Sequence, residues 1–328
     1  MESTIYDVSR LSGVSIATVS RTFSNPEKVR KSTREKVMNA AEALHYYPNA
    51  IARALAGQKT DKIAFIICKK DATILDEFYA RICEGILNEA NRLHYQLVIS
   101  TMDDWIRNHT MAKSNQIGGV ILAGSASADF VNDLQNQNVS IVLVNHYMPG
   151  YDLPCVVSDE RMGVTSLVDY LAAAGHRRIA MLAARVAPYV YGERYSAFMD
   201  AMRAHGLTVS SEDVVMCDAT LKDSTDASEL LLGKESRPTA VFCTNDLAAA
   251  GVFRAARRLG ISIPDGLSVV GYDDSSICKI LDPELTSIRI NCYTMGETSV
   301  RILDAVLNGQ PADRMTTIPV ELRVRKSS

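Results

Sequence analysis

The chain has 328 residues, of which 47% are hydrophobic and 22% charged, a balance that excludes a disordered polypeptide. No run of about eighteen apolar residues occurs, and the first residues lack the basic and apolar regions of a secretory signal, so we expect a cytoplasmic protein without membrane contacts. The seven cysteines form no C-x-x-C pair and the six histidines show no ligand spacing, so neither a metal site nor disulfides are expected.

Charge is distributed unevenly along the chain. The net charge is −3, but residues 1–60 hold nine Lys and Arg against five Asp and Glu, which gives this segment +4 and leaves −7 for the remainder. Such asymmetry is typical of a nucleic-acid-binding head on an acidic body, although chance clustering could also produce it.

The first residues predict two short helices joined by a tight turn. Apolar residues recur at helical spacing, first at Ile5, Val8 and Leu11 and then along residues 15–23. A helix-turn-helix needs a small residue near the crossing, a glycine in the turn and an apolar residue that locks the second helix. Ser9, Gly13 and Val19 meet these needs.

A third helix follows the first two. Its apolar face would consist of Val37, Ala40, Ala41 and Leu44. The sequence Ser32–Glu35 has the form of a capping box and predicts that the helix starts near Ser32.

The linker after this helix predicts one further short helix. Pro48 ends the preceding element, Asn49 is a good N-cap, residues 50–56 favour helix, and Gly57 suits the C-terminal position. A helix of about two turns is unstable alone in water, so this segment could also be a frayed linker.

From residue 62 onward, apolar strands alternate with amphipathic helices. Strands are predicted over 63–68, 96–100, 120–123, 141–145, 156–158, 179–183, 240–244 and 267–271, and helices over 78–94, 161–174, 194–205, 248–259 and 294–307. This alternation indicates an α/β fold with parallel sheets covered on both faces. Residues 62–328 are more than a single hydrophobic core usually holds, so two lobes are expected.

Motifs for enzyme chemistry are missing from this α/β region. It contains no G-x-G-x-x-G after a strand, no G-x-x-x-x-G-K-[ST] and no G-x-S-x-G. We therefore expect no enzyme and no cofactor.

Several motifs together resemble the lac repressor family (LacI/GalR), and the similarity runs across most of the chain. The segments that carry it are Ile5-Tyr6-Asp7-Val8, Gly13-Val14-Ser15, Thr18-Val19-Ser20-Arg21, Thr33-Arg34-Glu35-Lys36-Val37, Tyr47-Pro48-Asn49 and Ala52-Arg53-Ala54-Leu55. The resemblance implies a helix-turn-helix DNA-binding headpiece at 1–47, a hinge helix and linker at 48–61, and a two-lobed, periplasmic-binding-protein-like domain for effector binding and dimerisation at 62–328.

The resemblance also implies which residues meet DNA. Ile16, Ala17 and Arg21 would face base edges in the major groove, where Arg21 can bond guanine bidentately and the other two offer only apolar contact. The implied phosphate contacts, which hold register, are Thr18, Ser20, Ser24, Lys28 and Arg34. Paired hinge helices would add Asn49, Ala52, Arg53 and Leu55 at the minor groove, with Leu55 wedged between base steps.

An effector site is implied at the carboxyl ends of strands. Three positions match the family pattern: Arg194 in Arg-Tyr-Ser-Ala-Phe, Asn245 in Thr-Asn-Asp, and Asp273 in Val-Val-Gly-Tyr-Asp-Asp. Together they suit adjacent sugar hydroxyls, although each alone could cap a loop or form a salt bridge. Further candidates are Phe78, Tyr79, Asn145, Tyr147 and Tyr191.

Some features depart from the family pattern. Family members usually have Asn at the position of Ser24 and an N-capping Ser at that of Arg30, and the region 102–116 looks several residues shorter than usual. No leucine heptad follows the body, so a homodimer is expected rather than a tetramer.

The expected function is sequence-specific transcriptional regulation, as a repressor, at a pseudo-palindromic operator under the control of a small molecule. A sugar or sugar derivative is the expected effector, while a sugar acid or a purine stays open. Two alternatives also stay open: a regulator that answers to a protein co-repressor, and a sugar-binding protein without a DNA role.

Overall fold

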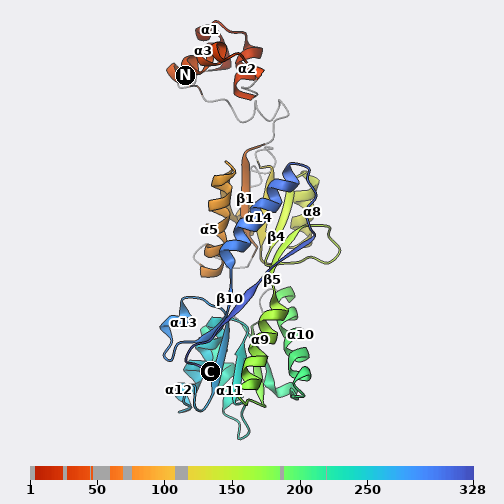
Figure 1. The fold of residues 1–328 in the computed structure, drawn as a ribbon, viewed down its shortest axis with the longest axis vertical. Coiled ribbons are helices and arrows are strands. Elements are labelled where there is room, and N and C mark those ends of the chain that lie inside the picture. Colours follow the sequence, from red (N-terminus) through yellow and green to blue (C-terminus); the bar gives the residue numbers. More distant parts are fainter. Residues whose placement is uncertain are drawn as a thin grey trace. The chain divides into compact units, whose positions relative to one another are not determined.

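The structure, a computed structural model, describes residues 4–24, 28–44, 46, 60–68, 76–107, 117–184, 188–218 and 220–328. These residues form a small helical headpiece and a larger α/β body (Figure 1). The hinge residues Asn49, Ala52, Arg53 and Leu55 and most of the shortened region 102–116 lie outside the described residues.

Three helices build the headpiece: α1 (Ile5–Ser12), α2 (Ile16–Ser24) and α3 (Lys31–Ala43). Its core consists of Val8, Val19, Val37, Ala40 and Ala41, each at most 5% exposed. The predicted helical faces are therefore confirmed, apart from Leu11, which is 56% exposed.

The turn between α1 and α2 depends on three residues, as the sequence predicted. Gly13 has a φ of 68°, a left-handed conformation that glycine adopts without steric cost. The hydroxyl of Ser9 donates to the carbonyl of Val14 at 2.7 Å and fixes the turn, while Val19 is fully buried.

The predicted capping box at Ser32–Glu35 is wrong. Helix α3 begins at Lys31, so Ser32 already lies inside the first turn, and the N-cap residue Arg30 makes no side-chain capping bond. A carboxylate caps α1 instead: Asp7 accepts hydrogen bonds from the backbone N–H of Thr4 at 2.9 Å and from its hydroxyl at 2.6 Å.

Two six-stranded sheets form the body, one in each lobe. In spatial order the first sheet contains β11 (Met315–Ile318), β5 (Cys155–Ser158), β4 (Ser140–Val144), β3 (Gly119–Ala123), β1 (Lys62–Ile67) and β2 (Gln96–Thr101). The second contains β12 (Val320–Arg323), β10 (Thr286–Ile290), β9 (Ser268–Asp273), β8 (Ala240–Cys243), β6 (Ile179–Ala184) and β7 (Val214–Cys217). Strands β3, β4, β5, β8 and β9 run parallel to their neighbours, whereas β12 is antiparallel to β10.

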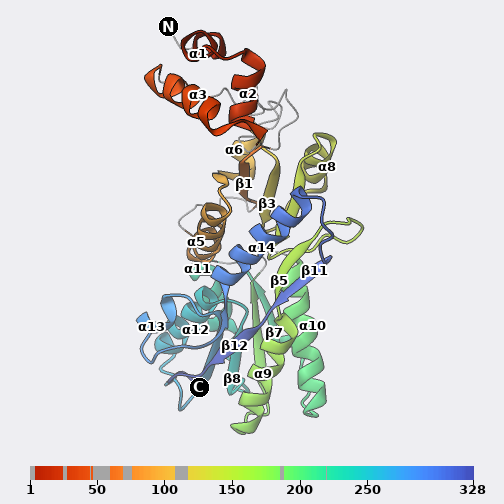
Figure 2. The ribbon, with the colours of Figure 1, turned by 45° about the horizontal axis from the view of Figure 1, so that its top comes forward.

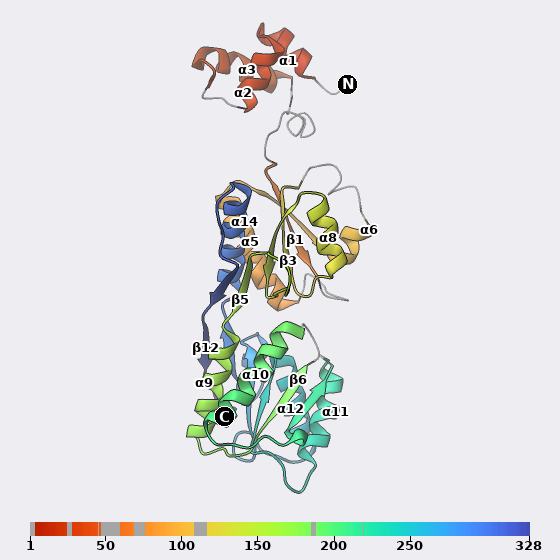
Figure 3. The ribbon, with the colours of Figure 1, turned by 90° about the vertical axis from the view of Figure 1, so that its right-hand side faces the viewer.

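Helices cover both faces of each sheet (Figure 3). On the first sheet α5 (Glu77–Arg92) and α14 (Cys292–Leu307) lie opposite α8 (Ala128–Asn136). On the second sheet α9 (Glu160–Ala173) and α10 (Pro188–Ala204) lie opposite α11 (Leu221–Leu232) and α12 (Asp246–Arg258). Shorter helices are α6 (Met102–Arg107), α13 (Ile277–Ile280) and a 3-10 turn at Ser211–Asp213. The predicted arrangement of two lobes with parallel sheets is confirmed.

The chain passes from one lobe to the other at residues 158–160, 290–292 and 318–320 (Figure 2). These crossing segments join β5 to α9, β10 to α14 and β11 to β12. Crossings of this kind let two lobes rotate about a common axis, and they position the site between the lobes.

Candidate functional site

A cavity of about 330 Å³ lies between the two lobes of the body. Its lining comes from the carboxyl ends of β4, β8 and β9 and from the first turns of α5, α12 and α14, with α10 alongside. The lining residues that the sequence predicted are Phe78, Tyr79, Asn145, Tyr191, Arg194, Asn245 and Asp273. Of the predicted effector residues, only Tyr147 does not line this cavity.

Arg194 occupies the centre of the polar network. It is 3% exposed, and its Nε donates to Oε2 of Glu160 at 2.6 Å while Nη2 donates to Oε1 at 3.3 Å. Nη1 donates to the carbonyl of Thr244. The expected partner Asp273 is more distant, with Nη2 and Oδ1 separated by 3.8 Å. Arg194 therefore belongs first to a buried ion pair with Glu160.

Helix α10 starts earlier than predicted. The sequence predicted a start at Arg194, whereas the helix begins at Pro188. Proline is favoured in the first turn of a helix because its missing N–H would have no partner there. Tyr191 and Arg194 consequently lie one helical turn apart and reach the same cavity.

Asp273, the last residue of β9, and Asn145, the residue after β4, both have an unusual backbone conformation. Their φ angles are 107° and 54°, which are positive values that residues other than glycine rarely adopt. Burial strongly raises the pKa of Asp273. Residues held in such conformations cluster at binding sites, where the surrounding structure imposes them.

Asn245 has a structural task in addition to its place in the cavity. Its Oδ1 accepts from the backbone N–H of Ala248 at 2.7 Å and caps α12, while Nδ2 donates to the hydroxyl of Tyr191 at 3.4 Å. The carbonyl oxygen of Asn245 is therefore engaged in the helix cap, and its amide nitrogen is the group that remains to donate in the cavity.

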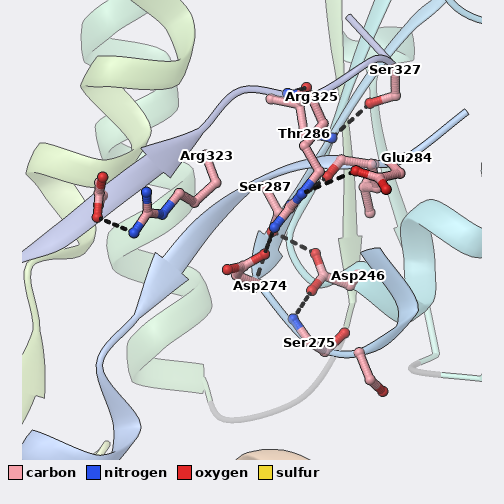
Figure 4. Close-up of polar contacts among 12 residues, drawn as sticks. Asp246, Asp274, Ser275, Glu284, Thr286, Ser287, Arg323, Arg325 and Ser327 are labelled. Carbon is pink, nitrogen blue, oxygen red and sulfur yellow. Dashed lines mark hydrogen bonds and ion pairs between the residues drawn. The ribbon is translucent and has the colours of Figure 1, made fainter. Parts of the chain in front are cut away.

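Asp246 also lines the cavity, although it was not among the predicted effector residues. It is 1% exposed, accepts from the hydroxyl of Ser287 at 2.6 Å and from the backbone N–H of Ser275 at 2.7 Å, and burial raises its pKa to about 6 (Figure 4). A side chain at Gly271 would collide with Oδ1 of Asp246, so any larger residue there would displace this carboxylate. Asp246 fixes the loop that follows β9.

Arg325 supports the same loop from behind. Its Nη2 donates to Oδ1 of Asp274 at 2.6 Å and its Nη1 to the carbonyl of Leu285 at 2.7 Å (Figure 4). The last residues of the chain thus hold the loop whose neighbour Asp273 lines the cavity.

Two contacts join the lobes beside the cavity. The carboxylate of Glu77 accepts from the backbone N–H of Ser276 at 3.0 Å and from its hydroxyl at 2.7 Å. Arg81 donates to the carbonyl of Asp274 at 3.2 Å. The structure therefore holds the lobes in contact at this edge.

The aromatic candidates divide into two groups. The rings of Phe78 and Tyr79 meet edge to face at 5.5 Å and line the cavity. Tyr147 instead packs against Tyr189, with ring centroids 5.4 Å apart, and under the guanidinium of Arg314 at 5.7 Å. The ring of Tyr147 therefore contributes to a contact between the lobes and does not line the cavity.

In the headpiece, the residues predicted to meet DNA lie on α2 and around α3. Ile16, Ala17, Ser20 and Arg21 are exposed on α2, and Lys28 is exposed after it. Arg34 is half-buried. The hydroxyl of Thr18, half-buried as well, lies 2.9 Å from that of Ser15.

Among the residues that the structure describes, no group of three His, Cys, Asp or Glu side chains could hold a metal ion. Within that part of the chain, no helix is both long and apolar enough to span a bilayer.

Two family descriptions match the sequence. Residues 4–49 match "Bacterial regulatory proteins, lacI family", and residues 168–328 match "Periplasmic binding protein-like domain". Catabolite control protein A of Priestia megaterium is 31% identical over 337 residues, covering 100% of each chain. The HTH-type transcriptional repressor CytR of Escherichia coli (strain K12) is 30% identical over 316 residues, covering 94% of this chain and 91% of the relative.

Solved structures show the same fold. The lac repressor dimer bound to operator and the anti-inducer ONPF superimposes with a TM-score of 0.83 at 25% identity, covering 100% of this chain and 99% of that one. The complex of the transcriptional regulator CelR with cellobiose gives a TM-score of 0.76 at 27% identity, covering 99% and 100%.

Proposed function

Because this chain belongs to the lacI family of bacterial regulatory proteins, we propose that it is a homodimeric repressor that binds a pseudo-palindromic operator under the control of a small molecule in the inter-lobe cavity. The chain is a DNA-binding transcriptional regulator, as its relatives are. It acts in the cytoplasm, where the operator is, and catalyses no reaction. Residues 1–47 bind DNA, 48–61 form the hinge, and 62–328 bind the effector and dimerise.

The proposed operator contacts follow from the exposed surface of α2. Arg21 is the side chain that can read guanine, Ile16 and Ala17 offer apolar contact, and Lys28 with Arg34 holds phosphates. Thr18 and Ser20 contribute further phosphate contacts from α2. Asn49, Ala52, Arg53 and Leu55 act at the minor groove once the hinge helix forms.

The observation that carries the effector proposal is the convergence of Arg194, Asn245 and Asp273 on one inter-lobe cavity. Donors and acceptors arranged beside aromatic rings suit the hydroxyls and ring face of a sugar, and a related regulator is described in complex with cellobiose. Phe78, Tyr79, Asn145 and Tyr191 complete the proposed site.

The proposed mechanism couples the cavity to the hinge. A ligand that closes or rotates the lobes changes the separation of the two hinges in the dimer, and the hinge helices then form or melt. Because a two-turn helix is near its folding threshold, a coupling of about 1–3 kcal/mol changes operator occupancy several-fold or more.

Selection from a random duplex library by the full chain, followed by gel shifts with a small-molecule panel, tests both parts. We expect an enriched inverted repeat, and one class of compound that shifts its Kd at least about fivefold. A library without an enriched inverted repeat would contradict the operator proposal, and an operator Kd that no compound changes would contradict effector control.

A further inference from the structure

The central arginine of the inter-lobe cavity is already neutralised from within the protein. All three guanidinium nitrogens of Arg194 have partners: Glu160 accepts from Nε and Nη2, and the carbonyl of Thr244 accepts from Nη1. Glu160 is itself 5% exposed and accepts a short hydrogen bond from Ser158. An anion that entered the cavity would have to displace Glu160 to gain a bidentate guanidinium contact.

Carboxylates outnumber guanidinium groups around the cavity. The carboxylates that line it or lie directly behind it are Asp76, Glu77, Glu160, Asp246 and Asp273, and the guanidinium groups are Arg81 and Arg194. Five negative and two positive groups leave a formal charge of −3, or −2 with a proton on Asp273. Asp274 and Arg325, next to this set, cancel each other as an ion pair.

Helix N-termini do not reverse this balance. Helices α5, α12 and α14 all begin at the cavity, and a helix N-terminus carries about half a positive charge. Two of them already have a carboxylate in the first turn, namely Glu77 on α5 and Asp246 on α12. Because these two carboxylates are already included in the excess, all three half charges count against it, and their sum of about +1.5 is smaller than an excess of two or three negative charges.

An unpaired acceptor lies in the same cavity. Asn145 is 8% exposed, and within the described part of the chain its Oδ1 has no hydrogen-bond partner. A buried acceptor without a donor is unfavourable, so a ligand that donates a hydrogen bond to it gains affinity. Hydroxyl and amino groups can donate, whereas ionised carboxylates and phosphates only accept.

We propose that the effector of this cavity carries no negative charge and binds through hydroxyl or amino donors, and that Glu160 is the residue that excludes anionic relatives such as sugar acids and sugar phosphates. The inference deepens the proposed effector function and rests on it. Glu160 acts on specificity through Arg194 and through its own charge.

To test this, the whole chain is incubated with an equimolar mixture of small molecules. The mixture contains glucose, galactose and ribose, their amino, acid and phosphate derivatives, and nucleosides with their monophosphates. Small molecules retained after rapid gel filtration are identified by mass spectrometry. Retention of uncharged or cationic compounds only is the expected result. Retention of an acid or phosphate in preference to its neutral parent overturns the charge inference and leaves effector binding intact, whereas retention of nothing overturns the effector proposal and this inference with it.

A matched pair of variants isolates the role of Glu160. Glu160→Gln keeps a hydrogen-bonding oxygen but removes the charge, so the affinity for the acid form relative to the neutral parent should rise about tenfold. Glu212→Gln, an exposed glutamate of the same lobe, should leave this ratio unchanged. An unchanged ratio in Glu160→Gln overturns the assigned role, and if that variant does not fold, the selection by the wild-type chain still decides the charge of the ligand.

Discussion

The guanidinium carbon of Arg194 lies 3.6 Å from the centroid of the Tyr272 ring. Tyr272 is fully buried and directly precedes Asp273, the last residue of strand β9. This stacking, together with Glu160, holds the Arg194 side chain in one orientation. A desolvated cation–π contact contributes about 2 kcal/mol.

Removing the ring from Tyr272 should therefore cost both stability and effector response. We expect Tyr272→Leu to lower the free energy of unfolding by about 2–4 kcal/mol and to weaken effector binding, because a cavity forms and Arg194 loses its stacking partner. Tyr272→Phe keeps the ring and should retain most of both quantities. Urea denaturation and effector titration of the two variants provide the measurement, and equal losses in both would contradict a role for the ring.

The overall architecture could be predicted because the apolar patterns that indicate strands and helices are local features of the sequence. Buried strands such as β1 and β8 are continuous apolar runs, and helices such as α5 and α12 carry one apolar face. Predicted bounds differ from the observed ones by a few residues, mainly at helix starts.

Helix α11 was missed because most of its buried face is polar. Ser224, Thr225 and Ser228 are buried, and apolar residues are buried only at the end of the helix, at Leu231 and Leu232, next to Leu230, which is 77% exposed. Small side chains fit there because Gly251 of α12 approaches closely, and the hydroxyl of Ser228 donates to the carbonyl of Ser224 at 2.6 Å. The adjacent edge strand β7 has too little buried surface to show a pattern.

Seven of the sixteen residues that line the cavity were among the predicted effector residues, but most of the carboxylates around it were not. Glu160 lies at the first residue of α9, where a glutamate usually faces solvent, and it was left outside the predicted helix. Only the three-dimensional approach of α10 to α9 reveals its partner Arg194. Asp246 was hidden for the same reason, since its partners Ser275 and Ser287 are distant in sequence.

Gly271 provides a test of the loop that follows β9. In Gly271→Ala the new methyl group would collide with Oδ1 of Asp246, which would have to release Ser287 or Ser275. We expect a loss of about 1–3 kcal/mol in the free energy of unfolding and weaker effector binding. Gly192→Ala is the matched control, because an added Cβ there meets nothing within 4 Å and alanine favours helix. If the two variants unfold alike, the contact with Asp246 has no structural importance.

His146 should make stability depend on pH. Burial lowers the pKa of His146 below its usual 6.5, so the unfolded chain binds this proton more readily than the folded one. The contribution of neutral His146 to the free energy of unfolding is therefore fully present above about pH 6.5, and it decreases as the pH falls below that value. His146→Gln should therefore lose less stability than the wild type between about pH 7.5 and about pH 5.5.

The difference between variant and wild type is the informative quantity for His146. Burial lowers the pKa of His176 and raises that of Asp246 to about 6, and both groups titrate in the two backgrounds, so their contributions cancel. His94→Asn is the control, since His94 is exposed and asparagine tolerates its φ of 61°. Parallel stability curves for the wild type and His146→Gln would contradict the assignment.

Arg21 and Lys28 should affect operator binding in different ways. If Arg21 reads guanine, Arg21→Ala should cost about 1–3 kcal/mol at the best site, relax the preference at one base position in each half-site, and leave the salt dependence of binding nearly unchanged. If Lys28 holds a phosphate, Lys28→Ala should weaken binding to all sequences alike and reduce the slope of log K against log salt by about 1 for each half-site. Gel shifts over a salt series, with the selected operator and its single-base variants, separate the two effects. A base preference that Arg21→Ala leaves intact would move the readout to Ile16, Ala17 or the hinge, because Arg21 is the guanidinium group exposed on α2.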